Sequence, residues 1–466
     1  MGNHRAAIVI GAGISGLVCA YRLKTLGVDV LLIEKNDRVG GVIQSENIDG
    51  FLIERGPNSS QGTEELIALV EELGILEELV EGNPKAPAYV YFKGRLHAVP
   101  SGPGSFIRSD LLSPAGKLRV LKELFVPRRG HRTEESVAAF ARRRIGDEAA
   151  ERLVAPFVSG IYAGDADLLS VKAAFPRLAN LEQNYGGLFR GMFAKAREAR
   201  RAKKNAGAVL EKAAPTRRLC SFRTGMAFLP KTLASKLGED LLTGCTELRI
   251  ARAPDLRTFT LEFERGGNRH QLVADHLILA TPSNVAASLL GLISTELRDL
   301  LDEIEYPPLS IVSLAYETSR VSTLLDGFGF LVPPSEKMNI LGCVWNSSLF
   351  HNRAPNGTSL LTSFVGGARN PDAAQSADAE LVSIVHGELQ KVLGISTEPR
   401  VISITRYQRS IPQYNIGHFE RVRRIESLLQ EAPGVQLIGN YLHGVSTGDC
   451  IKEAERVAKS VAELVD

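Results

Sequence analysis

Apolar runs separated by a glycine-rich turn open the chain and predict a strand–helix–strand unit. Residues 6–10 (AAIVI) form a continuous apolar run, which is typical of a buried parallel strand. Residues 14–26 carry apolar residues three and four positions apart, as on one face of a helix, and residues 29–33 (DVLLI) form a second buried run. Together the three segments predict a βαβ unit at the start of an α/β fold.

Helical and strand periods alternate along the rest of the chain. Apolar spacings of three and four predict helices, whereas short apolar or alternating runs predict strands. The predicted helices cover residues 62–81, 378–392 and 449–464. Two predicted strands form a hairpin over 89–100 that turns at Lys93-Gly94. Further strands are predicted within 241–282, beginning with the run LLTGCTELRI at 241–250, and within 306–365, 400–407 and 434–440.

Residues 106–214 are rich in Ala, Arg and Leu without strand alternation, and they predict a separate helical insertion. Within it, residues 117–204 carry 19 Lys and Arg against 10 Asp and Glu, although the whole chain has 55 against 53. The densest run, AKAREARRAKK at residues 194–204, is typical of a solvated basic face. The alternative is a surface that meets anionic lipid or an acidic substrate. The overall net charge of +2 gives no indication of nucleic-acid binding.

Cysteine usage and the start of the chain favour a cytoplasmic protein. The five cysteines are scattered without a C-x-x-C pair, and they predict neither disulfides nor a metal site. The first buried strand begins within six residues, where no signal peptide fits. No apolar run reaches the ~18 residues of a transmembrane helix, so any membrane contact is expected to be peripheral.

A glycine-rich turn follows the first strand and predicts a dinucleotide site. Residues 11–16 (GAGISG) fit G-x-G-x-x-G, whose glycines allow the tight turn, the approach of a pyrophosphate and close packing of the helix. The helix N-terminus adds free N–H groups and the positive end of its dipole. Glu34 ends the second strand, where a carboxylate can accept hydrogen bonds from the ribose hydroxyls.

Further turns favour FAD over a nicotinamide cofactor. Arg38 and the pair Gly40-Gly41 follow Glu34, and they suit a longer dinucleotide that needs more backbone donors. Near the C-terminus, a Gly-Val-Ser-Thr-Gly turn (444–448) precedes a helix that Asp449 can cap and that could receive the flavin's pyrimidine end. The chain has a single G-x-G-x-x-G, so we expect the organic substrate to reduce the flavin directly.

Five stretches resemble the bacterial protoporphyrinogen oxidases, within the larger superfamily of FAD-dependent amine oxidases and desaturases. The resemblance runs from end to end; SGIYAGD and IPQYNIGH are specific to this family, whereas the first stretch is superfamily-wide. The stretches are VIGAGISGLVCAYRL (9–23), ERGPNS (54–59), VSGIYAGDADLLSVKAAFPRL (158–178), DGFGFLVP (326–333), and IPQYNIGHFERV (411–422) with LIGNYLHGVSTGDCI (437–451).

The resemblance implies an α/β fold with three parts. The Rossmann-type FAD-binding domain would span residues 1–85 with 215–285 and 425–466. A mixed-sheet substrate domain would span residues 86–105 with 286–424, and residues 106–214 would form a helical, membrane-associating domain.

The resemblance also implies the residues of the site. The FAD contacts would be Gly11, Ala12, Gly13, Ile14, Ser15, Gly16, Glu34, Lys35, Arg38, Gly40, Gly41, Val42, Gly56, Pro57, Asn58, Ser59, Glu247, Val445, Ser446 and Thr447. The walls around a flat macrocycle would be Phe157, Gly160, Phe328, Gly329, Leu331 and Phe364. No metal is implied, and no side chain is expected to act as catalytic acid or base.

The implied reaction is the oxidation of protoporphyrinogen IX to protoporphyrin IX in haem biosynthesis. In each of three steps a hydride passes from a ring methylene to the flavin and a ring N–H loses a proton, and molecular oxygen is the expected acceptor that reoxidises the flavin. Coproporphyrinogen III is the alternative substrate, although residues 58–66 and 182–190 look less basic than its four propionates would need. The resemblance implies a cytoplasmic protein with peripheral contact to anionic membrane, and it allows a homodimer. An amine oxidase, a carotenoid desaturase and a non-catalytic FAD-fold binding protein stay open.

Overall fold

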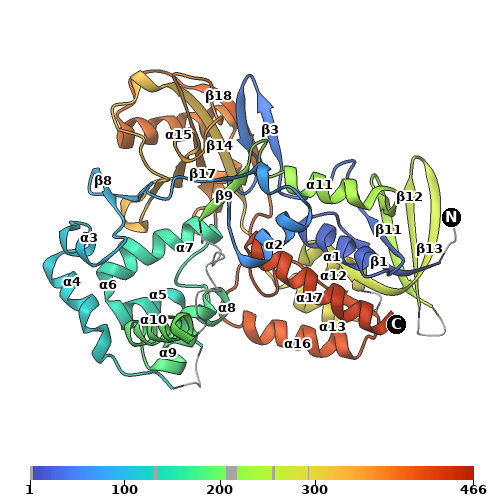
Figure 1. Cartoon of the computed structure of the whole chain (residues 1–466). Helices are drawn as coiled ribbons and strands as arrows, with labels where there is room; N and C mark the ends of the chain where they lie inside the picture. The colour runs from blue at the N-terminus through green and yellow to red at the C-terminus, as the bar shows by residue number, and fades with distance from the viewer. Residues whose placement is uncertain (1–3, 131–133, 206–217, 254–257, 292, 466) are drawn as a thin grey trace.

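The computed structural model describes residues 4–130, 134–205, 218–253, 258–291 and 293–465. Two seven-stranded sheets dominate these residues, and a group of helices lies beside them (Figure 1). Two smaller sheets connect the large ones. They consist of β3 (Ser45–Ile48) with β4 (Phe51–Glu54), and of β5 (Ser60–Gln61), β9 (Leu219–Phe222) and β6 (Leu79–Glu81).

The first large sheet contains the predicted βαβ unit. Strands β10, β2, β1, β13 and β19 lie side by side and parallel, and β12 and β11 extend the sheet antiparallel from the first half of β13. The strands are β1 (His4–Ile10), β2 (Val30–Ile33), β10 (Leu241–Leu242), β11 (Thr246–Arg252), β12 (Phe259–Arg265), β13 (Asn268–Leu279) and β19 (Val435–Leu437).

Helices cover both faces of this sheet, which explains why its parallel strands are apolar throughout. One face packs on α1 (Ile14–Thr25), α2 (Glu64–Glu72), α11 (Phe228–Leu237) and α17 (Thr447–Val465). The other face packs on α12 (Ser283–Leu290), α13 (Thr295–Asp302) and α16 (His418–Gln430). The carboxyl ends of β1, β2 and β13 meet at one edge, where α1 begins.

The second large sheet has the order β18–β14–β17–β16–β15–β7–β8, and α15 (Asp378–Leu393) buries one of its faces. The predicted hairpin is confirmed, since Lys93 and Gly94 both have positive φ, as the two residues of a tight hairpin turn require. The strands are β7 (Ala88–Phe92), β8 (Arg95–Ala98), β14 (Leu309–Glu317), β15 (Gly329–Leu331), β16 (Ile340–Trp345), β17 (Thr358–Gly366) and β18 (Arg400–Tyr407).

Helices predominate from residue 103 to residue 205, as the sequence predicts; residues 206–214 of the predicted insertion lie outside the described part of the chain. The α-helices are α3 (Pro103–Arg108), α4 (Pro114–Leu121), α5 (Val137–Ile145), α6 (Asp147–Ala149), α7 (Ala155–Tyr162), α8 (Val171–Ala174), α9 (Pro176–Tyr185) and α10 (Leu188–Asn205). Two further turns are η2 (Lys122–Phe125) and the π-helical η3 (Ala150–Val154).

Two predicted elements were wrong in extent. The helix predicted over 62–81 ends at Glu72, because Gly74 takes a positive φ of 70° and turns the chain into η1 (Leu76–Glu78) and β6. The run 241–250 splits into β10 and β11, which pair with different strands. The proposed domain boundaries stay a prediction. α12, α13 and α16, which fall largely within the predicted substrate domain, pack on the first sheet.

A buried ion network stabilises the helical group. The Arg144 guanidinium is fully buried and lies 3.2 Å from the Glu123 carboxylate and 2.8 Å from that of Glu182. Glu123 also accepts the N–H groups of Leu188, at 2.7 Å, and Phe189, at 3.1 Å. Because these N–H groups begin α10, one network joins α5, η2, α9 and α10.

Replacing Arg144 with methionine is expected to lower the free energy of unfolding by about 3–5 kcal/mol, since it leaves the fully buried Glu123 carboxylate without its cation, whereas Glu182 keeps Arg143. Arg142, two residues earlier, pairs with Asp167 in an exposed position and gives the matched control R142M, expected to cost ~1 kcal/mol or less. Urea unfolding measures both. Equal losses in the two variants would contradict the role of the buried network.

Candidate functional site

The first glycine turn leaves bare backbone at the carboxyl edge of the first sheet. A Cβ on Gly16 would lie 1.9 Å from the carbonyl oxygen of Gly11, so no larger residue fits there. Gly11 has a φ of 99°, which makes the tight turn. A Cβ on Gly13 would meet no protein atom within 4 Å, which leaves open space over the start of α1. That space and the free N–H groups fit a pyrophosphate.

The second glycine turn lies directly against the first. The Gly40 N–H donates to the carbonyl of Ala12 at 2.8 Å, and a Cβ on Gly41 would lie 3.3 Å from the Cα of Gly13. The Arg38 guanidinium donates to the Gly41 carbonyl at 2.8 Å and closes the turn. The two predicted turns therefore form one continuous stretch of backbone.

A third turn, at Gly56-Pro57 in the stretch ERGPNS, packs on the second. A Cβ on Gly56 would lie 2.0 Å from the carbonyl oxygen of Val42, so only glycine fits at this position. The Asn58 side chain accepts a hydrogen bond from Asn346 Nδ2 at 2.7 Å. Because Asn346 follows β16 directly, this bond connects the glycine turns to the second sheet.

Glu34 is buried beside the first turn, 7% exposed. Its carboxylate accepts the Ala12 N–H at 2.7 Å, and the backbone N–H and side-chain amide of Asn36 at 2.9 and 2.6 Å. A carboxylate has further acceptor positions, so it can still receive ribose hydroxyls. Lys35 next to it is exposed.

The C-terminal turn lies beside the start of α1. The Cys450 thiol is hydrogen-bonded to Ser15, and burial raises the pKa of this thiol to about 11, so it is neutral and unreactive. α17 begins at Thr447, two residues earlier than predicted, and its cap is Ser446 and not Asp449 as expected: the Asp449 N–H donates to Ser446 Oγ at 3.1 Å. In the described residues, the N–H groups of Val445 and Thr447 have no hydrogen-bond partner.

Apolar residues line the face of the second sheet opposite α15. Leu331, Gly342 and Phe364 are directly opposite one another on β15, β16 and β17. Phe328 and Phe364 pack against the same buried cluster. A Cβ on Gly160, in α7, would lie 2.8 Å from Leu331 Cδ2, so α7 closes directly over this face.

The remaining wall residues differ in exposure. Phe157 on α7 is 52% exposed, with its ring 6.3 Å from that of Phe175. Gly329 is buried, and a Cβ there would lie 2.0 Å from the carbonyl oxygen of Cys343. Val445 packs against the buried cluster that contains Val158 and Tyr162 of α7, so the C-terminal turn and the wall helix share this cluster.

The structure thus brings the predicted turns and walls together, with one exception. Glu247 is exposed at a bulge of β11 with a φ of 51°, and no contact in the described residues joins its side chain to the glycine turns. Two residues earlier, the Cys245 N–H donates to the Glu34 carbonyl at 2.9 Å.

Sequence reasoning missed a buried ion pair behind the third turn. Glu54 accepts hydrogen bonds from Ser45 Oγ at 2.5 Å and from the Met226 N–H at 3.0 Å, and lies 3.3 Å from Arg353. Burial raises the pKa of Glu54 to about 7, although Arg353 opposes the shift. Glu54 stands in the quoted stretch ERGPNS, but nothing in the sequence identifies a partner 299 positions away.

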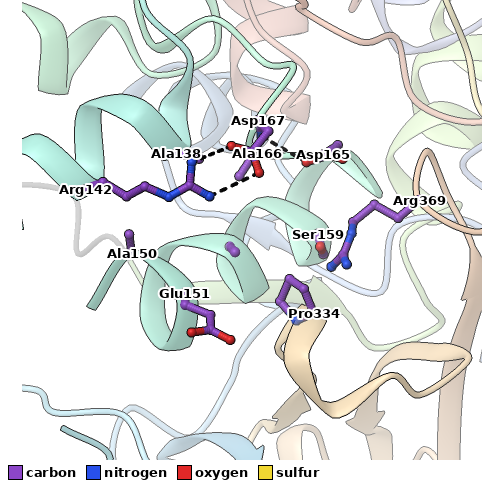
Figure 2. Close-up of a pocket in the computed structure, with 11 residues that line it drawn as sticks. Ala138, Arg142, Ala150, Glu151, Ser159, Asp165, Ala166, Asp167, Pro334 and Arg369 are labelled. Carbon is purple, nitrogen blue, oxygen red and sulfur yellow. Dashed lines mark hydrogen bonds and ion pairs between the residues drawn. The ribbon is translucent and has the colours of Figure 1, made fainter. Parts of the chain in front are cut away.

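A separate cavity of about 280 Å³ lies beside α7, between the helical group and the second sheet (Figure 2). The Arg142 guanidinium pairs with Asp167 at its rim, and Arg369 extends toward Ser159 (Figure 2). Its lining includes charges of both signs, unlike the apolar walls on the sheet face, so we do not assign the macrocycle to this cavity.

The family described as "Flavin containing amine oxidoreductase" matches residues 14–462. The chain belongs to this family. The chain is 35% identical to "Protoporphyrinogen oxidase 1, chloroplastic" of Arabidopsis thaliana over 97% of this chain and 87% of the relative. It is 30% identical to "Coproporphyrinogen III oxidase" of Bacillus subtilis over 97% of each chain.

Solved structures agree with the family assignment. A protein of Exiguobacterium sp., named as a candidate protoporphyrinogen oxidase, superposes with a TM-score of 0.81 at 27% identity, over 100% of this chain and 99% of that one. A putrescine oxidase with a TM-score of 0.69 and 16% identity, over 98% and 99% of the two chains, shares the fold.

These findings confirm the resemblance, the mixed-sheet α/β class and the assignment as a flavoenzyme. FAD is the cofactor, and the chain is an FAD-dependent oxidase. The non-catalytic alternative is therefore set aside. The individual contacts with FAD and with a substrate stay predictions.

Replacing Glu34 with alanine is expected to weaken FAD binding about ten- to hundredfold, because a hydrogen bond to a charged group contributes ~1.5–3 kcal/mol. The control D29A removes an exposed carboxylate that pairs with Arg5 at the other end of β2. Titration of each apoprotein, followed by flavin fluorescence, measures the dissociation constant. Unchanged affinity in E34A would exclude Glu34 from the adenosine site.

Proposed function

We propose that this chain oxidises protoporphyrinogen IX to protoporphyrin IX, with FAD as the immediate and molecular oxygen as the final electron acceptor. One observation carries the proposal: the bare glycine turns and an apolar sheet face covered by α7 meet at the Asn58–Asn346 contact. The names of the curated relatives point to porphyrinogens as the substrate class.

The side chains of the site bind and orient the substrate. Bound FAD supplies hydride acceptance from a ring methylene. Phe328, Leu331 and Phe364 offer an apolar surface for a flat macrocycle, and they exclude water from it. Gly342 lies between Leu331 and Phe364, and a Cβ there would lie 3.1 Å from Leu331 Cδ2. A ring N–H proton leaves with each hydride, and no side chain of the chain is assigned to accept it.

The uncharged character of the walls supports protoporphyrinogen over coproporphyrinogen III. The six proposed wall residues carry no charge, whereas a macrocycle with four propionates would need more cations around its edge than one with two. Coproporphyrinogen III remains the second candidate, because the relative named "Coproporphyrinogen III oxidase" matches 97% of this chain.

Porphyrin fluorescence tests the reaction and the substrate together. Purified holoenzyme under air is expected to produce porphyrin from both macrocycles, and faster from protoporphyrinogen IX. An anaerobic sample is the control, in which oxidation should stop once the bound flavin is reduced. Preference for coproporphyrinogen III would reverse the substrate assignment, and no oxidation of either by FAD-loaded protein would reject the function.

We propose further that the helical group docks on an anionic membrane. Phe125 is 82% and Phe193 64% exposed, and Ile107 is also exposed. Ile107 lies on α3 and Phe193 on α10, two helices that share a buried cluster, and Phe125 ends η2, which contacts α10. Lys122 and Lys195 lie within three residues of Phe125 and Phe193 in the sequence. No helix in the described residues is long and apolar enough to span a membrane. Apolar side chains with nearby cations fit a peripheral contact with anionic lipid.

The double variant F125D/F193D is expected to lower binding to phosphatidylglycerol vesicles at least tenfold, since burial of one such ring contributes ~1.5–3 kcal/mol. The control is L324D, which changes a residue of similar exposure, 76%, between β14 and β15. Vesicle co-sedimentation measures both. Equal retention of the double variant and L324D would contradict this docking face. The cytoplasmic location and a homodimer stay expectations from the resemblance.

A further inference from the structure

The two motifs that set this family apart, SGIYAGD and IPQYNIGH, pack against each other. Gln413 Nε2 donates to the carbonyl of Tyr162 at 2.8 Å. A Cβ on Gly164 would lie 2.5 Å from Gln413 Oε1, so glycine is needed for this approach. Each motif thereby fixes the backbone of the other, and neither role requires contact with substrate.

Tyr414 connects this pair of motifs to the C-terminal turn. Its side chain is 1% exposed. The hydroxyl donates to the Asn440 carbonyl at 2.7 Å and accepts the Gly444 N–H at 2.9 Å. One hydroxyl therefore bridges the two ends of the segment 440–444, immediately before Val445 and the start of α17.

The ring of Tyr414 is held in place from two sides. His418 stacks on it with ring centres 4.2 Å apart and planes 12° apart, and Tyr162 lies 5.7 Å away. The His418 ring also faces the backbone of Tyr441 and Leu442, and burial lowers its pKa to about 4. The ring is therefore neutral near pH 7 and can stack without a desolvated charge.

The geometry points to Tyr414 as a positioning residue that holds segment 440–444 in the conformation in which the following turn binds the flavin. This inference rests on the proposed flavin contacts at Val445–Thr447. Without the hydroxyl, the Asn440 carbonyl and the Gly444 N–H lose the partner that joins them, and the segment gains alternative conformations. Only a fraction of the protein would then be ready to bind, which weakens the apparent affinity by that fraction.

The variant Y414F tests this role, and Y162F is the matched control. Both remove one buried hydroxyl from the same aromatic cluster, but the hydrogen bond of the Tyr162 hydroxyl goes to the Ala174 carbonyl at 3.0 Å and not to segment 440–444. Y414F is expected to bind FAD about tenfold more weakly, the effect of losing one buried hydrogen-bonding group, with faster FAD release. Y162F is expected to bind FAD as the wild type does.

The measurement is a titration of apoprotein with FAD, without substrate, together with thermal unfolding of each apoprotein. Weaker binding in Y414F alone supports the inference. Equal weakening in both variants, or in neither, overturns it. If Y414F does not fold, H418L removes the stacked ring but keeps the hydroxyl, and unchanged FAD affinity there overturns the inference as well. Because no porphyrinogen is used, the result is independent of the proposed substrate.

Discussion

The structure depends on keeping backbone bare where two helices begin side by side. α1 and α17 start next to each other, joined by the Ser15–Cys450 contact, and a ligand can reach their N–H groups only if no side chain covers them. Even a methyl side chain is too large at Gly16, since it would overlap the carbonyl of Gly11. The second and third glycine turns extend the same surface toward the second sheet. The glycine turns therefore form one continuous strip of backbone N–H donors, and the apolar walls lie beside it.

Sequence periodicity predicted the elements that follow a single hydrophobic pattern. The apolar runs of β1, β2 and β19 and the amphipathic α15 lie where their pattern of apolar residues placed them. Prediction was wrong where a pairing partner is distant in sequence. Residues 76–81 continue a helical spacing, but β6 pairs with β9, about 140 positions later, and Gly74 breaks the helix first. The split of 241–250 has the same cause, since β10 and β11 pair with different strands.

The candidate site was predictable where chemistry is carried by short motifs, and hidden where it is carried by long-range contacts. The glycine turns could be predicted because the short motif itself explains its glycines, by the tight turn, the space for a pyrophosphate and the close packing of the helix. Glu54 and Arg353 could not, although they join the turn region to the second sheet. Both side chains are nearly fully buried. Removing Glu54 would therefore leave the Arg353 guanidinium as a buried charge without the carboxylate that it pairs with. The pair joins β4, which leads into the third glycine turn, to the segment that precedes β17.

The same reasoning explains why the most distinctive motifs carry no reactive side chain. SGIYAGD contributes the end of the wall helix, and IPQYNIGH contributes the tyrosine that touches the C-terminal turn. Glu134 joins the helical group to this arrangement, since it accepts the Gly417 N–H at 2.6 Å and is hydrogen-bonded to Ser170. A flavoenzyme whose cofactor does the chemistry can vary its walls to change substrate, but the walls and the cofactor turn must keep their relative position. Residues that hold this position are therefore as characteristic of the chain as residues that would touch the macrocycle.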